Sequence, residues 1–271
     1  MRPIADWDDA YANAAHIPGG DRWPAAWVEP AQRFREAHPP EEIAYGPHPR
    51  ERLDLFRPRG EAQGLAAFVH GGYWMRFDRS FWSHLAGGAL ARGWAVAMPS
   101  YPLAPEARVA AIGRSVARAV ETAAERVPGP VRLAGHSAGG HLVARLAVGE
   151  ALPFALASRV ERVVPVSGLF DLRPLLFTEM NGTLGLDLAE ARAESPALLM
   201  PRVGTRLVAW VGQAERSEFV RQSALIANIW RGCGAETDLA VEPDRHHFDV
   251  IDGLADPASP LCEAWLGEIR P

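Results

Sequence analysis

The sequence lacks lysine altogether, and all 28 of its basic residues are arginine. Schiff-base catalysis, a serine–lysine dyad and a phosphate-binding P-loop each require a lysine, so these three kinds of chemistry are excluded. Any nucleophilic catalysis by this chain must therefore use a histidine or a carboxylate as its base.

Cysteine is almost as scarce, because Cys233 and Cys262 are the only two. They are too few for a disulfide framework, their spacing does not suit a metal site, and a reducing compartment is the simplest inference. The N-terminus carries acidic residues and no apolar signal-peptide core, and no stretch is long and apolar enough to span a bilayer. We therefore expect a cytoplasmic protein with no membrane partner.

The charge is modest, with a net value of −5 and no run of basic residues. This balance argues against a nucleic-acid partner or an acidic membrane surface. With 271 residues and 48% hydrophobic composition, the chain suits one large domain over residues 1–271 with a sizeable core. We expect a small-molecule substrate as its partner and leave a homodimer open.

Strand-like and helix-like segments alternate along most of the chain. Some strand-like segments, such as residues 206–211, are largely apolar runs in which polar and apolar residues do not take turns. Such runs are typical of strands buried on both faces. The alternation predicts an α/β fold, in which helices cover both faces of a mostly parallel sheet and no large cap domain is added. We expect strands at 52–56, 66–70, 95–101, 131–135, 160–167, 206–212 and 236–241, and helices at 21–37, 81–92, 109–127, 140–149 and 217–231.

Two segments stand outside this alternation. Residues 1–45 precede the first clear strand and are rich in tryptophan, proline and alanine, so we expect short helices that lie over the body of the protein. Residues 171–205 contain turn-forming residues and interrupt the alternation. We expect them to form a short excursion near the functional site.

The segment GHSAG at residues 135–139 follows an apolar run and opens a helix-like segment. A serine hydroxyl is a weak nucleophile, so it must be exposed, held still and placed beside a base. A sharp strand-to-helix turn exposes it, and the flanking glycines avoid side-chain clashes, as in the nucleophile elbow of α/β-hydrolases. We predict Ser137 as the nucleophile and interpret His136 and His141 as residues that pack in the core or that support the catalytic residues from behind.

The segment HGGYW at residues 70–74 follows another predicted strand. Acyl transfer develops a negative oxygen, and glycines let backbone N–H groups approach it closely. We predict an oxyanion hole formed by the N–H groups of Gly72, Tyr73 and Ala138, although a glycine turn beside aromatic core residues would have the same sequence. The side chains of Tyr73 and Trp74, and the tryptophans within residues 1–45, would suit contact with an aromatic substrate, although aromatic residues near a pocket are more often only part of its wall.

A base and an acid should follow the nucleophile in the chain. His246 and His247 come after the last predicted strand, and we favour His247 because Phe248 and the helix expected after it would anchor that position. The acid should follow the strand at 206–212, where Glu215 and Glu218 are the candidates. We favour Glu215, because a carboxylate in the first turn of a helix, such as Glu218, is accounted for by the helix dipole.

These segments together resemble the arylformamidase (kynurenine formamidase) branch of the α/β-hydrolase superfamily, near the hormone-sensitive-lipase-like esterases. The resemblance implies that Gly72 and Tyr73 donate to the oxyanion, that the acid lies just before EFVRQS, and that the histidine directly precedes a phenylalanine. It thus supports Glu215 and His247, although many relatives have an aspartate at or next to the acid position, where this chain has Ala214. The resembling segments are HGGYW (70–74), YPLAPE (101–106), GHSAGGHL (135–142), SGLFDLRPL (167–175), EFVRQS (218–223) and HHFDV (246–250).

The predicted function is that of a serine hydrolase that needs no cofactor and no metal. The resemblance implies an aryl-formamide substrate such as N-formylkynurenine, cleaved through an acyl-enzyme on Ser137. The alternatives are a carboxylesterase for short-chain acyl esters and, from another class of protein, a non-catalytic binding protein on a hydrolase scaffold.

Overall fold

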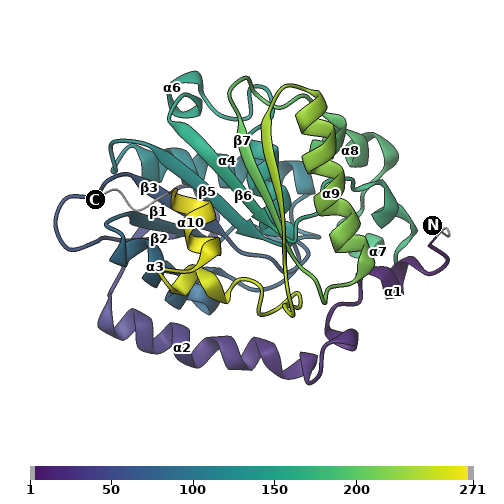
Figure 1. Cartoon of the computed structure of the whole chain (residues 1–271), viewed down its shortest axis with the longest axis horizontal. Helices are drawn as coiled ribbons and strands as arrows, with labels where there is room; N and C mark the ends of the chain where they lie inside the picture. Colours follow the sequence, from purple (N-terminus) through teal and green to yellow (C-terminus); the bar gives the residue numbers. More distant parts are fainter. Residues whose placement is uncertain (1–3, 268–271) are drawn as a thin grey trace.

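The computed structural model describes residues 4–267, which fold around one eight-stranded sheet (Figure 1). The strand order is β1-β2-β4-β3-β5-β6-β7-β8, in which β1, β2 and β4 pair antiparallel and all later neighbours pair parallel. The prediction of an α/β fold with a mostly parallel sheet is thereby confirmed. The strands are β1 (Glu41–Ala44), β2 (Arg52–Phe56), β3 (Leu65–Val69), β4 (Ala95–Pro99), β5 (Val131–His136), β6 (Val160–Val166), β7 (Arg206–Gly212) and β8 (Glu236–Glu242).

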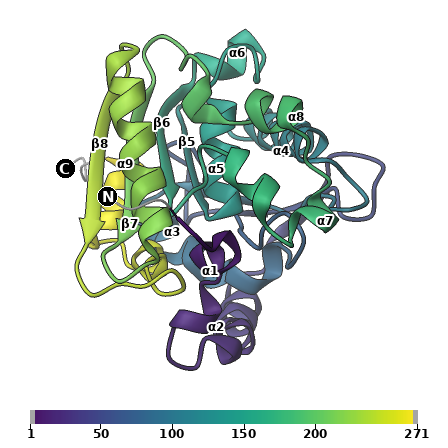
Figure 2. The same ribbon diagram turned by 90° about the vertical axis from the view of Figure 1, so that its right-hand side faces the viewer.

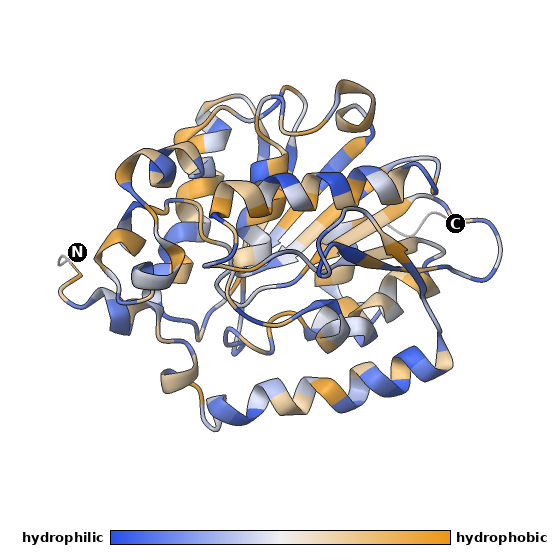
Figure 3. Cartoon of the chain, turned by 180° about the vertical axis from the view of Figure 1, so that it is seen from behind, coloured by the Kyte–Doolittle hydropathy of each residue, from blue (hydrophilic) through white to orange (hydrophobic). Residues whose placement is uncertain are grey.

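The central strands are buried on both faces, which is why their sequences read as unbroken apolar runs. In β3, Leu65, Ala67 and Val69 point into one hydrophobic cluster, whereas Ala66 and Phe68 point into the other. Coloured by hydropathy, the central strands are mostly orange, and blue gathers in loops and on the outer sides of helices (Figure 3). The two edge strands, β1 and β8, differ from these because most of their residues are at least partly exposed.

Helices cover both faces of the sheet, as the alternation predicts. The helices α4 (Val109–Ala124), α5 (Ala138–Leu146) and α9 (Ser217–Gly232) supply apolar residues to the first cluster. On the other face lie α2 (Trp23–Ala37), α3 (Gly87–Ala91) and α10 (Pro260–Leu266). The short helices are α1 (Trp7–Tyr11), α6 (Phe154–Ala157), α7 (Asn181–Leu184) and α8 (Leu188–Ala193), and 3-10 turns lie at 14–16, 20–22, 79–86, 173–177, 196–198 and 252–255.

One predicted helix differs from the structure, and one strand was not predicted. The helix expected at 81–92 is a 3-10 segment, Arg79–Ala86, followed by the short α3, because Trp82 (φ −126°) departs from helical geometry. The edge strand β1 was not expected, because only one of its four residues, Ile43, is buried, and so its sequence shows little apolar pattern.

The carboxyl ends of the parallel strands meet at one edge of the sheet, where ligands bind in open α/β sheets. In Figure 2 the arrowhead of β8 points down, toward the side of the molecule where α1 and α2 lie. The N-terminal segment therefore lies on the side of the predicted site. Residues 171–205 form turns and the helices α7 and α8 rather than a separate cap. Within residues 4–267, no helix is long and apolar enough to cross a membrane.

Candidate active site

The nucleophile candidate Ser137 lies in a sharp turn between β5 and α5. Its φ of 55° is in the left-handed region, a strained conformation for a residue with a side chain that tends to occur at functional sites. Two backbone hydrogen bonds hold the turn: Ser137 N–H donates to Val166 O (2.8 Å), and His141 N–H donates to Ser137 O (3.1 Å). The loop of residues 70–74 packs directly against this turn, because a Cβ on Gly71 would lie 2.9 Å from Ser137 Cβ.

The acid and the base candidates are bonded to each other. His247 Nδ1 lies 2.6 Å from Glu215 Oε2, and both side chains are almost fully buried. The other carboxylate oxygen of Glu215 accepts a hydrogen bond from Gly212 N–H (2.8 Å) and one from the hydroxyl of Ser167. Because a carboxylate accepts hydrogen bonds, Nδ1 carries the proton, and Nε2 of His247 is the ring atom available as a base.

His246 and Glu218, the alternative candidates for the base and the acid, form hydrogen bonds with other groups. Nδ1 of His246 accepts from Phe248 N–H (3.2 Å), and its ring packs edge-on against Trp23 at 5.0 Å. The buried Glu218 accepts hydrogen bonds from Tyr11, Arg221 and Gln222. The structure thus brings together Glu215 and His247, and not Glu218 or His246.

Ser137 and His247 line the same cavity, which has a volume of about 630 Å³. Residues 11–27 form much of its wall. Trp27 from this segment, together with Phe77 and Trp82, contributes aromatic rings to the wall. Among the described residues, the hydroxyl of Ser137 has no hydrogen-bond partner, so it is free to bond with a group that enters the cavity. Sequence reasoning pointed to the N-terminal tryptophans, of which Trp27 lines the cavity, but it missed Phe77 and Trp82, because the spacing of their segment also fits a packed core.

The predicted oxyanion donors lie on the same cavity wall or next to it. Gly72 has a φ of 105°, and a Cβ at this position would lie 2.6 Å from Arg76 O, so the turn requires glycine. Among residues 4–267, no acceptor is bonded to the backbone N–H of Gly72 or of Tyr73. The N–H of Ala138 belongs to the first turn of α5, where N–H groups have no partner within the helix.

Trp74 does not lie where the sequence led us to expect it. Its side chain is fully buried, it is not one of the residues that line the cavity, and its ring packs edge-on against His141 at 5.1 Å. The backbone explains the difference, because Tyr73 and Trp74 both have positive φ, a turn in which Tyr73 lines the cavity and Trp74 enters the core. The predicted substrate contact therefore remains for Tyr73 and not for Trp74.

Of the two interpretations of His136, the structure favours the one in which it supports the candidate catalytic residues. It lines the cavity, and its Nε2 lies 2.8 Å from the backbone oxygen of His247. A carbonyl oxygen only accepts, so Nε2 of His136 is the donor. Burial, together with the nearby His247, lowers the pKa of His136 well below its usual value, so this ring is neutral.

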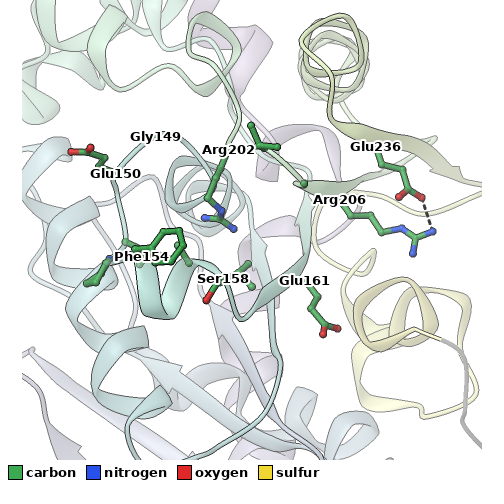
Figure 4. A pocket seen from close by; sticks show the side chains of 14 residues that line it. Gly149, Glu150, Phe154, Ser158, Glu161, Arg202, Arg206 and Glu236 are labelled. Atoms are coloured by element: carbon green, nitrogen blue, oxygen red, sulfur yellow. Dashed lines mark ion pairs between the residues drawn. The ribbon is translucent and has the colours of Figure 1, made fainter.

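A second and larger cavity, of about 1080 Å³, lies at the opposite edge of the sheet, where β6, β7 and β8 begin. Figure 4 shows Arg206 paired with Glu236 at the side of this cavity and Arg202 directed toward the centre of the cavity. Nη2 of Arg206 lies 2.6 Å from Oε1 of Glu236. None of the predicted catalytic residues lines it. The candidate active site is therefore the smaller cavity, at the carboxyl ends of the strands.

The chain is similar to several known hydrolases. A family model described as the alpha/beta hydrolase fold matches residues 66–174. A kynurenine formamidase from Salmo salar is 27% identical over 234 residues, which make up 83% of this chain and 80% of that protein. A solved structure from Silicibacter sp. TM1040, provisionally described as a thioesterase, is 47% identical, with a TM-score of 0.92 over 96% of this chain and 98% of that one. An esterase from Pyrobaculum calidifontis shares the fold, with a TM-score of 0.69 at 18% identity over 90% of this chain and 89% of that one.

The fold and these similarities define the class of protein: the chain belongs to the α/β-hydrolase superfamily and is a hydrolase. The similarity to three kynurenine formamidases, at 25–27% identity, supports the resemblance to the arylformamidase-like branch of that superfamily that was seen in the sequence.

Proposed function

We propose that this hydrolase cleaves an aryl-formamide, such as N-formylkynurenine, through a formyl-enzyme on Ser137. The observation that carries the mechanism is the pair formed by His247 and Glu215, 2.6 Å apart beside a cavity that Ser137 also lines. A carboxylate bonded to Nδ1 fixes the tautomer in which Nε2 is the base and stabilises the imidazolium that forms.

The reaction follows from the positions of these groups. Ser137 Oγ attacks the formyl carbon while Nε2 of His247 accepts the hydroxyl proton, a contact that forms when the substrate is bound. The carbonyl oxygen becomes negative and accepts hydrogen bonds from the N–H groups of Gly72, Tyr73 and Ala138. His247 then returns the proton to the departing arylamine, which leaves a formyl ester on Ser137. Water, activated by the same imidazole, releases formate and restores the serine.

The cavity supports an aromatic substrate. The rings of Trp27, Phe77 and Trp82 provide a wall for an aryl group, which aromatic side chains bind well through offset and edge-on contacts. Asp21 and Arg76 also line the cavity, are exposed, and have no ion-pair partner among the described residues. One free acid and one free arginine complement the ammonium and the carboxylate of an amino acid.

The similarity to kynurenine formamidases supports the same substrate class. The second candidate is an esterase acting on short acyl esters or thioesters. It is favoured by the 47% identity to the protein provisionally described as a thioesterase, because the same three residues would also cleave an activated ester.

Turnover measured on N-formylkynurenine and on p-nitrophenyl acetate distinguishes the candidates, with the Ser137→Ala variant as the control for spontaneous hydrolysis. We expect the larger kcat/KM for the formamide. Negligible formamide cleavage beside rapid ester cleavage would overturn the formamidase proposal and support the esterase.

A further inference from the structure

Asn13 is a buried polar residue of the active-site cavity to which the mechanism gives no role. It lies between α1 and the 3-10 turn Ala14–His16, is only 6% exposed, and lines the cavity together with Ser137 and His247. Its Oδ1 is shielded from solvent and has no hydrogen-bond partner within residues 4–267. A buried acceptor without a partner destabilises the fold, and such groups often have a functional explanation.

The orientation of the Asn13 amide follows from its neighbours. The hydroxyl of Tyr73 donates to Tyr11 O at 2.6 Å, and it has only one proton to give. Burial raises the pKa of Tyr73, so that proton is retained. The contact between Asn13 Nδ2 and the Tyr73 hydroxyl, at 3.3 Å, therefore has the amide nitrogen as its donor. Oδ1 is thus the amide atom left without a partner.

Tyr73 also gives the position of Asn13 relative to the reacting carbonyl. The backbone N–H of Tyr73 belongs to the proposed oxyanion hole, whereas its hydroxyl contacts Asn13. Asn13 therefore lies about the length of a tyrosine side chain from the position that the carbonyl oxygen of a bound substrate would occupy. A substrate with its carbonyl at the oxyanion hole would reach Asn13 with a group on the far side of an aromatic ring.

We propose that Oδ1 of Asn13 is a specificity determinant that accepts a hydrogen bond from an amino group of the substrate, carried across an aryl ring from the scissile carbonyl. The inference rests on the proposed function for the position of that carbonyl. Because Oδ1 of Asn13 only accepts hydrogen bonds, it favours a substrate group that donates one. The negative charge of Asp21, which lines the same cavity, favours an amino or ammonium group over a neutral hydroxyl. A site with a buried acceptor discriminates against a ligand that leaves the acceptor unpaired.

Equilibrium binding to the Ser137→Ala variant tests this without catalysis. The ligands are matched pairs, meta- and para-aminoformanilide against the corresponding methylformanilides, which differ by an amino group in place of a methyl group. The quantity measured is the ratio of the two dissociation constants, obtained from the change in tryptophan fluorescence on binding, to which Trp27 and Trp82 in the cavity wall contribute.

In the Ser137→Ala background we expect at least one amino ligand to bind more tightly than its methyl partner. Adding Asn13→Leu should reduce that preference about tenfold, since it removes the acceptor while keeping a similar volume. Adding Asn13→Asp instead keeps an oxygen acceptor and should retain the preference. General damage to the cavity would weaken both ligands of a pair equally and leave the ratio unchanged.

A preference that Asn13→Leu leaves unchanged for both pairs, or that is absent before the substitution, would overturn the assignment of Asn13. This result is independent of turnover, so it stands whether or not the wild-type protein cleaves formanilide. Failure of the wild-type protein to cleave formamides would count against the proposed function alone.

Discussion

Nε2 of His136 donates to the backbone oxygen of His247 across 2.8 Å, and the two rings lie 4.6 Å apart. His136 directly precedes Ser137, so this bond connects the nucleophile turn to the loop that carries the proposed base. Ser137 and His247 are more than one hundred residues apart in the chain, so their relative position depends on hydrogen bonds between their loops, such as the one from His136.

We predict that His136→Leu lowers kcat about ten- to hundredfold, because the loop with His247 loses the bond that places it beside Ser137. His136→Gln keeps an N–H donor near the position of Nε2 and should lose less. Steady-state kinetics on the better substrate test this, and equal losses in the two variants would show that the hydrogen bond is not what matters.

The adjacent histidines allow a direct comparison. His247→Ala should lower kcat/KM by about 10³-fold or more, as expected when a triad base is removed. His246→Ala should have a much smaller effect, because His246 contacts Trp23 and the backbone of its own loop rather than the cavity. If His246→Ala were the inactive variant, the assignment of the base would be wrong.

The two glutamates are tested in the same way. Glu215→Gln removes the charge that faces Nδ1 of His247 and should lower kcat about 10²- to 10⁴-fold with little change in folding. Glu218→Gln should act mainly on stability, through the bond of Glu218 to Tyr11, which joins α1 to α9, and its bond to Arg221 within α9. Kinetics and thermal unfolding of both variants separate these effects, and the reverse order in kcat would move the acid to Glu218.

Buried histidines predict how stability depends on pH. Burial lowers the pKa of His70 and of His141 to about 4, from an ordinary value of 6.5. Between these values the unfolded chain binds protons that the folded chain does not, so the free energy of unfolding falls as the pH falls from 6.5 toward 4. Each group contributes a loss of up to about 3 kcal/mol at pH 4.

Urea unfolding at several pH values in this range measures that loss. His141→Gln removes one of the two groups while its amide can still donate to Glu194 O, the acceptor that lies 2.7 Å from Nε2 of His141. Stability of this variant should decline less steeply with acidification than that of the wild-type protein. The same slope in both proteins would mean that folding does not lower the pKa of His141.

Much of the fold was predictable because its signals are local. The strands β5, β6 and β7 are long apolar runs, and α4 and α9 show amphipathic patterns with clear ends. The strand β1 lacked such a signal, since its residues are mostly exposed at an edge of the sheet.

The site was predictable where a motif fixes the backbone, and less so where tertiary contacts decide. GHSAG and HGGYW require particular turns, so the positions of Ser137 and Gly72 follow from sequence. The burial of Trp74 depends on two consecutive positive φ angles, which the residues Tyr and Trp do not indicate. The unpaired oxygen of Asn13 depends on Tyr73 and Tyr11 together, and no pattern within residues 10–16 signals it.

The most direct test of the account is labelling with a fluorophosphonate probe, followed by mass spectrometry of the modified peptide. The account predicts one modified residue, Ser137, no labelling in Ser137→Ala, and much slower labelling in His247→Ala, because the probe reacts only with a serine activated by its base. A folded wild-type protein that is not labelled, or is labelled equally fast without His247, would contradict the claim that these residues form a nucleophile and its base.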